Sequence, residues 1–240
     1  MIKEESVLID LKIIYEDDHL VAINKPHGLL VHKSRIASDA KQFALQLVRN
    51  YCGHYVYPVH RLDRKTSGVL LFAKSSEIAS LVQQQFKEKT ISKQYLALVR
   101  GFTPERGKID YCIGEKENKK NAITEYYTLK RYEIEYASHY HPTSRYSLVQ
   151  IHPLTGRFHQ IRKHMAHIHH PIIGDRPHGC NKQNRFWKDT FGVEIMLLHA
   201  SKLTLKDLRG NLIKVDAPKS EMFSSVLQKL STLSVVDSPI

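Results

Sequence analysis

Residues 58–68, PVHRLDRKTSG, place one carboxylate, Asp63, among Arg61, Arg64 and Lys65, directly before the apolar run VLLFA. An aspartate beside arginines is most often an exposed ion pair worth at most about 1 kcal/mol. A loop that leads into a buried strand, however, is often held rigidly for binding or catalysis. The segment alone therefore leaves two interpretations of Asp63 open, a surface ion pair and a reacting carboxylate. Thr66, at its end, offers a hydroxyl for phosphate.

A second candidate segment is TGRFHQIRKHMAHIHHPIIGD, residues 155–175. A helix over about 157–168 would turn Arg157 and Arg162 toward different neighbours. One arginine could meet an RNA backbone while the other forms a bidentate pair with a carboxylate and keeps that acid ionised. The segment also holds five histidines, but it has no H-E-x-x-H spacing and no thiolate, so we predict no metal site.

In SKQYLALVRG, the third segment, Lys93 and Tyr95 share one face of a predicted strand. A strand tyrosine is usually a packing residue, although near a basic cleft it can stack on an extruded base. The sequence does not separate these two interpretations of Tyr95.

Composition narrows the class of protein. The 240 residues are 42% hydrophobic, which can supply a core, and 36 basic against 24 acidic residues give a formal charge of +12. That excess favours a nucleic-acid partner, although basic proteins also bind membranes. The three cysteines are far apart and form no C-x-x-C pair, which favours the reducing cytoplasm. The sequence has no apolar run of about 20 residues that could cross a bilayer, so we expect an unexported cytoplasmic protein outside the membrane. Phosphate-loop and dinucleotide-binding glycine patterns are missing from the sequence, which predicts no cofactor.

Strand patterns outnumber helical ones without a regular alternation, which predicts an α+β fold with a mixed, largely antiparallel sheet and flanking helices. We expect one domain over residues 1–232 and a loosely ordered tail over 233–240. Helices are expected at 39–52 with Ser38 or Asp39 as cap, at 75–89 with Ser75 as cap, and at about 157–168 and 219–230. Strands are expected at 12–16, 19–25, 67–75, 91–101, 108–113, 122–136, 145–152, 196–205 and 211–217.

Four segments together resemble one family. HRLDRKTSG, the K-x-Y of Lys93 and Tyr95, TGRFHQIRKH and the early NKPHGLLVH are similar in order and spacing to the RluA family of pseudouridine synthases. HPTSRYSLVQIHPLTGRFHQIRKHMAHIHHPIIGD and HGCNKQNR resemble its TruC type, the tRNA pseudouridine-65 synthases. The resemblance implies a single catalytic domain with a central active-site cleft and no S4 domain.

The same resemblance implies roles for particular residues. Asp63 would be the catalytic aspartate, Tyr95 would pack on the target uracil, Arg162 would pair with Asp63, Arg61 would enter the space left by the flipped nucleotide, and Ile161 would line the uridine pocket. Substrate or RNA contacts are also expected from Arg157, His60 and Thr66, whereas Arg64 receives no role beyond a phosphate contact. The carboxylate could attack the ribose, attack the base or abstract the C2′ proton.

The expected partner is RNA, most of all tRNA, bound by a monomer. Two alternatives stay open at this point: a 23S rRNA pseudouridine synthase of the same family, and a catalytically silent RNA-binding module.

Overall fold

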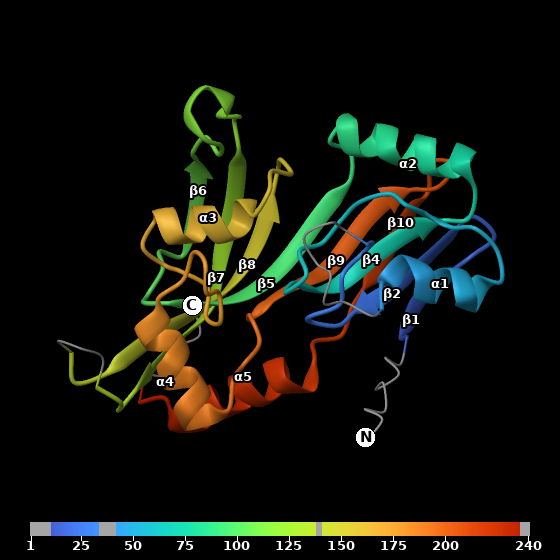
Figure 1. Cartoon of the computed structure of the whole chain (residues 1–240). Coiled ribbons are helices and arrows are strands. Elements are labelled where there is room, and N and C mark those ends of the chain that lie inside the picture. Colours follow the sequence, from blue (N-terminus) through green and yellow to red (C-terminus); the bar gives the residue numbers. More distant parts are fainter. Residues whose placement is uncertain (1–10, 34–41, 138–140, 236–240) are drawn as a thin grey trace, which may run out of the picture.

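The computed structural model describes residues 11–33, 42–137 and 141–235. In these residues, strands of one ten-stranded sheet follow the order β1-β2-β4-β9-β5-β8-β7-β6, with β3 added beside β4 and β10 beside β9 (Figure 1). The strands are β1 (Ile13–Glu16), β2 (Leu20–Lys25), β3 (Tyr57–Pro58), β4 (Ser67–Ala73), β5 (Ser92–Arg100), β6 (Arg106–Asp110), β7 (Ile123–Ile134), β8 (Ser144–Pro153), β9 (Leu198–Lys206) and β10 (Leu212–Asp216).

The helices are α1 (Ala44–Cys52), α2 (Ser76–Lys87), α3 (Gln160–His167), α4 (Asn181–Phe191) and α5 (Glu221–Leu233). Strands β4 and β9 pair in parallel. The other paired strands of the described sheet are antiparallel. The α+β class and the mixed, largely antiparallel sheet are therefore confirmed.

Strand β4 is the centre of the N-terminal half, and all of its residues are buried. Because successive side chains point to opposite faces, Val69 and Leu71 pack in the cluster that includes residues of α2, while Leu70 and Phe72 pack in the cluster that includes residues of α1. Helix α2 begins as expected, because the Ser75 hydroxyl accepts a hydrogen bond from the N–H of Ile78 at 3.3 Å.

Strand β5 has the same role in the other half of the molecule. Ala97 and Val99 share a cluster with residues of α3, whereas Leu98, on the opposite side, shares one with Trp187 of α4 and Phe223 of α5. Helix α3 thus covers one face of the sheet, and α4 and α5 cover the other (Figure 1). Helix α4 was not predicted from the sequence.

Three helices begin or end several residues away from the expected positions. The first helix begins at Ala44, after an extended Phe43, and the expected caps Ser38 and Asp39 lie outside the described residues. The third helix begins at Gln160 rather than 157.

The C-terminal helix continues to Leu233, and the N–H of Val235 donates to the carbonyl of Glu133 at 2.8 Å. Ser234 and Val235 therefore pair with β7, while the tail over 233–240 stays a prediction. Residues 236–240 lie outside the described part of the chain. None of the helices in the described ranges has the length and apolar character needed to cross a membrane.

Candidate active site

A cleft of about 1190 Å³ opens between the loop before β4, the end of α2, the start of β5 and the β8–α3 connection. Segments far apart in the sequence meet there. All eight residues that the sequence singled out line this cleft: His60, Arg61, Asp63, Thr66, Tyr95, Arg157, Ile161 and Arg162. The expected central cleft is therefore present.

The loop that carries Asp63 is closed by its own backbone. The N–H of Thr66 donates to the carbonyl of Asp63 at 3.0 Å, and the Ser67 hydroxyl lies 2.9 Å from Nδ1 of His199. Gly68 follows at a φ of 109°, where an added Cβ would lie 2.2 Å from the carbonyl oxygen of Ala200. Only glycine permits this approach of β4 to β9, which explains the final residue of HRLDRKTSG.

A buried lysine ties this loop to the loop after β2. Lys25 is fully buried, and its Nζ donates to the carbonyl oxygens of Pro26, Leu29 and Arg64 at 2.9, 2.9 and 3.1 Å. Burial lowers the pKa of Lys25 to about 7, and the charge of Asp63 opposes that shift. The three carbonyls match the three donors of an ammonium group, so this contact fixes the residue next to Asp63.

Arg64 itself completes that connection. The N–H of Gly28 donates to the Arg64 carbonyl at 2.8 Å, and Nε of Arg64 donates to the Gly28 carbonyl at 3.1 Å. Two reciprocal hydrogen bonds therefore join the two loops. Arg64, to which the sequence assigned only a phosphate contact, helps to position the backbone of the Asp63 loop.

Arg162 lies between two carboxylates. Its Nη1 donates to Oδ2 of Asp63 at 3.2 Å, as expected, while Nε and Nη2 donate to Oδ2 and Oδ1 of Asp175 at 2.8 and 2.7 Å. The bidentate pair is therefore with Asp175. Burial lowers the pKa of Arg162, but the hydrogen bonds and charges of Asp175 and Asp63 outweigh it and raise the pKa overall. Arg162 stays charged and fixed.

Asp175 is held in turn by a tight turn and by α4. Gly174 has a φ of 82°, and an added Cβ would lie 2.0 Å from the carbonyl oxygen of Ile195. The Asn184 side chain accepts from the N–H of Gly174 and donates to the carbonyl of Asp175, both at 2.8 Å. The glycine of HHPIIGD and an asparagine of HGCNKQNR thus orient the carboxylate that orients Arg162.

His159 approaches Asp63 from the start of α3. Its Nε2 lies 3.7 Å from Oδ2 of Asp63, and its Nδ1 lies 2.9 Å from Nε2 of His178. Burial is the main cause that lowers the pKa of His159 to about 4, and Arg162 and His178 lower it further against the opposing charge of Asp63. The ring is therefore neutral near pH 7, and Arg162 is the positive partner of Asp63.

Tyr95 and Ile161 form an apolar wall beside Asp63. Ile161 is buried, and Tyr95 packs against the cluster that contains it. Burial, together with the charge of Asp63, raises the pKa of the Tyr95 hydroxyl. The hydroxyl is therefore protonated at neutral pH, and Tyr95 lines the cleft.

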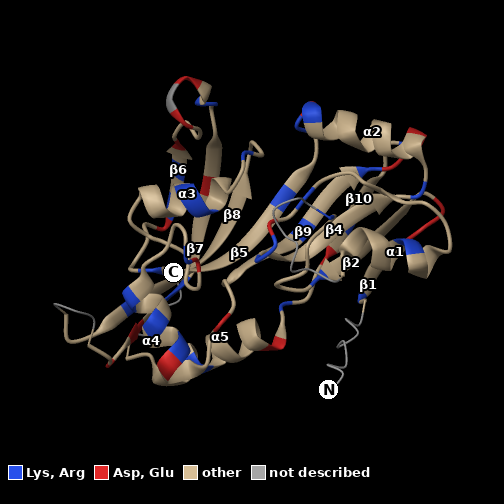
Figure 2. Ribbon diagram, in the orientation of Figure 1, with Lys and Arg blue, Asp and Glu red and all other residues tan. Residues whose placement is uncertain are grey.

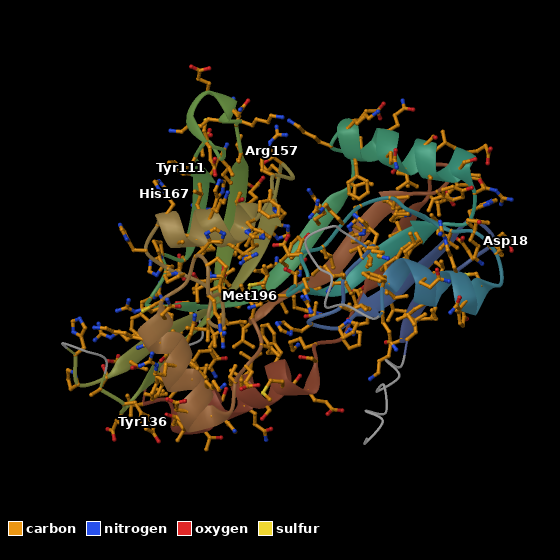
Figure 3. The ribbon with its side chains drawn as sticks, viewed as in Figure 1. Asp18, Tyr111, Tyr136, Arg157, His167 and Met196 are labelled. Carbon is orange, nitrogen blue, oxygen red and sulfur yellow. The ribbon has the colours of Figure 1, made fainter. Side chains whose placement is uncertain are left out.

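The remaining predicted residues lie around this centre. Arg157, labelled in Figure 3, lies on the loop between β8 and α3, and its Nε donates to the carbonyl of Asn121 at 3.1 Å. Arg157 precedes the helix, so the helical angle expected between it and Arg162 does not apply, although the two do face different neighbours. Nε2 of His60 accepts from the N–H of Leu71 at 3.0 Å, which commits that ring atom to β4.

The histidines of residues 155–175 have separate partners. His164 lies 2.9 Å from the Thr124 hydroxyl, His170 lies 2.8 Å from the Arg100 carbonyl, and His167 stacks on Tyr111 with ring centroids 3.7 Å apart (Figure 3). In the parts of the chain that are described, no three His, Cys, Asp or Glu side chains come together as metal ligands would.

Comparison with known proteins assigns the fold and the cleft to a family. Residues 19–167, more than half of the chain, match the family model described as RNA pseudouridylate synthase. The chain belongs to the RNA pseudouridylate synthase family. This family membership makes it an RNA pseudouridine synthase, an isomerase that converts uridine to pseudouridine.

Relatives within the family share much of the chain. It is 44% identical over 205 residues to the tRNA pseudouridine synthase C of Vibrio vulnificus, covering 80% of this chain and 84% of that protein. It is 46% identical over 232 residues to the tRNA pseudouridine synthase C of Yersinia pestis, covering 91% and 90%. The solved structure of human RNA pseudouridylate synthase domain containing 1 superposes with a TM-score of 0.73 at 23% identity, over 98% of this chain and all of that one, which supports the fold.

Sequence reasoning missed Lys25, Asp175, His159 and His178 as parts of the site. Each lies in a stretch that was quoted for its resemblance, NKPHGLLVH, HHPIIGD, TGRFHQIRKH or HGCNKQNR. Their place inside these motifs could have marked them as candidate site residues. Their residue types alone, however, did not show which atoms they contact.

Proposed function

We propose that the protein isomerises a specific uridine of tRNA, uridine 65, to pseudouridine, with Asp63 acting on a flipped-out nucleotide. The tRNA substrate is supported by the names of relatives that are 42–47% identical. The observation that carries the proposal is Asp63 held 3.2 Å from a buried, doubly anchored Arg162 inside a basic cleft. We further propose that it acts as a monomer in the cytoplasm and without a cofactor, because the isomerisation involves no redox change.

The chemistry divides among the side chains of the cleft. The reaction breaks the N-glycosidic bond of uridine, rotates the uracil and forms a carbon–carbon bond to the same ribose. Each open route, attack on the ribose, attack on the base or removal of the C2′ proton, requires an ionised and oriented Asp63. Arg162 supplies that orientation, and the rings and methyl groups of Tyr95 and Ile161 contact the uracil and keep water away from it.

The target base must leave its stack before Asp63 can reach it, at a cost of a few kcal/mol. In our proposal, Arg61 enters the space left behind, and packing of Tyr95 on the uracil offsets part of the cost. The side chain of Arg61 is exposed at the rim of the cleft, where it can make this contact.

Charge around the cleft fits an RNA partner. Its lining contains the cations Arg61, Lys87, Lys89, Lys93, Arg157 and Arg162, against the carboxylates Asp63 and Glu125. Figure 2 shows Lys and Arg in blue at the end of α2 and on α3, and Lys87 of α2 and Arg162 of α3 both line the cleft. Such a surface supplies sequence-independent affinity, so binding should weaken steeply with added salt.

The test is pseudouridine formation by purified wild-type protein and the Asp63→Asn variant, on a tRNA transcript and on 23S rRNA fragments. We expect one tRNA position to be converted by the wild type only, with tRNA binding largely retained by the variant. Conversion confined to rRNA would instead identify the alternative substrate. Activity of Asp63→Asn equal to that of the wild type would refute the role of this carboxylate.

A further inference from the structure

Phe158 is the most exposed of the large apolar side chains that line the cleft among the described residues, ahead of Tyr127 and Leu154. Phe158 lines the cleft with 60% of its surface accessible, although it lies between Arg157 and the partly buried His159. Its ring stacks on that of His159 with centroids 3.8 Å apart and planes inclined by 21°. Because His159 covers one face, the exposed area belongs to the other face and the edge of the ring. An aromatic ring that is fixed on one face and open on the other offers a stacking surface.

Two cations lie over this ring. Cζ of Arg61 and Nζ of Lys163 lie 5.9 and 5.8 Å from its centroid. Both distances are near the outer limit of a cation–π contact, so a ligand can displace these weak contacts. Single-stranded nucleic-acid binders combine an exposed aromatic ring, which stacks on a base, with neighbouring basic side chains, which contact the phosphates.

We propose that the open face of Phe158 stacks on an RNA base adjacent to the extruded uridine, with Lys163 at a flanking phosphate. This inference rests on the proposed function, since it assumes an RNA substrate with a flipped target. The position supports it: Phe158 stacks on His159, whose Nε2 is 3.7 Å from Asp63, so only one ring separates the stacking face from the reacting carboxylate. When the target uracil is extruded, the neighbouring base loses a stacking partner, and the ring of Phe158 takes the place of that uracil.

The first test compares Phe158→Leu, which keeps an apolar side chain without a π face, with Phe158→Trp, which enlarges that face. Steady-state pseudouridine formation is measured on a tRNA transcript. From the usual strength of base–aromatic stacking, we expect KM to rise roughly 5- to 150-fold in Phe158→Leu and to stay within about 3-fold of the wild type in Phe158→Trp. The kcat at saturating tRNA should change little, because Phe158 does not touch the reacting atoms.

Tyr55 provides a matched control. It is 71% exposed and has Cζ of Arg49 4.7 Å from its ring centroid, but it does not line the cleft. Tyr55→Leu should leave KM and kcat unchanged. An equal rise of KM in Tyr55→Leu and Phe158→Leu would overturn the inference, as would wild-type KM in Phe158→Leu.

A fluorescent base separates stacking from a general loss of affinity. A tRNA transcript with 2-aminopurine beside the target uridine is bound to Asp63→Asn protein that carries Phe, Trp or Leu at position 158. Stacking should quench the fluorescence with Phe and Trp but not with Leu at saturating protein. Identical quenching in all three would refute the stacking, whereas wild-type protein without any activity on tRNA would refute the proposed function instead.

Discussion

The arrangement of Asp63, Arg162 and Asp175 predicts that stability and activity can be separated by a pair of substitutions. The side chains of Arg162 and Asp175 are only 4% and 1% exposed, and that of Asp63 is 19% exposed. Removing one partner of a buried ion pair leaves an uncompensated charge, which typically costs about 3–5 kcal/mol. Arg162→Met should therefore lower the free energy of unfolding by about that amount, since it leaves Asp175 buried without its counter-charge.

The double variant Arg162→Met/Asp175→Asn removes both buried charges. At an effective dielectric constant of about 20, two unit charges about 4 Å apart interact by about 4 kcal/mol, so removing Asp175 as well should restore most of the stability lost in Arg162→Met. We expect the double variant to recover at least about 2 kcal/mol of the free energy of unfolding. Pseudouridine formation should not recover, because Asp63 still lacks its Arg162 contact, and misplacement of a reacting group by about 1 Å can cost roughly 100-fold in rate.

The assay is urea unfolding monitored by fluorescence of Trp187, the single tryptophan of the chain, which is 1% exposed in the core beneath α4. Turnover on tRNA is measured in parallel. A double variant no more stable than Arg162→Met would refute the role of Asp175 as counter-charge. A double variant with wild-type turnover would refute the need for Arg162 at Asp63.

Two further outcomes follow from the loops around the site. Lys25→Met should lower the free energy of unfolding by about 1–3 kcal/mol in urea titrations and slow turnover, since it leaves the carbonyls of Pro26 and Leu29 without their Lys25 donor. A free energy of unfolding equal to that of the wild type would contradict this. Burial is the main cause that lowers the pKa values of His27 and His60 to about 4. As the pH falls below about 6.5, these histidines therefore take up protons in the unfolded chain before they do so in the folded protein. The contribution of the two neutral rings to the free energy of unfolding is fully present above about pH 6.5 and is lost as the pH falls toward about 4. The Tm of His60→Gln should therefore fall less over this range than that of the wild type, and parallel pH profiles would be evidence against a neutral buried His60.

The elements predicted best from the sequence are those whose pattern is unambiguous. A continuous apolar run identified β4, and the Ser75 cap identified the start of α2. Helix α4 escaped prediction because it begins after Cys180 without a capping side chain and opens with the polar residues NKQNR. Its Trp187 and Phe191 become recognisable as a buried face only when β5, β7 and β8 are in place.

Local conformation accounts for the misplaced start of α3. His159 adopts a φ of 55°, which a histidine rarely takes, so the helix cannot include Arg157. The Gln160 side chain secures that turn, since its Oε1 accepts from the N–H of Arg157 at 3.0 Å and its Nε2 donates to the carbonyl of Ile123 at 2.9 Å. A contact with a residue 37 positions earlier is invisible to a helical pattern.

The sequence predicted that Arg162 meets a carboxylate but could not predict how its donors are divided. Had both terminal donors gone to Asp63, that carboxylate would be tied to the arginine through both oxygens. Instead Asp175 takes Nε and Nη2, which fixes the guanidinium plane, and a single 3.2 Å contact orients Asp63 through Oδ2. Among the described residues, Oδ1 of Asp63 has no hydrogen-bond partner, and Asp63 lines the cleft. The turn at Gly174, set by the approach of Ile195, determines this division, and no pattern in residues 58–68 contains it.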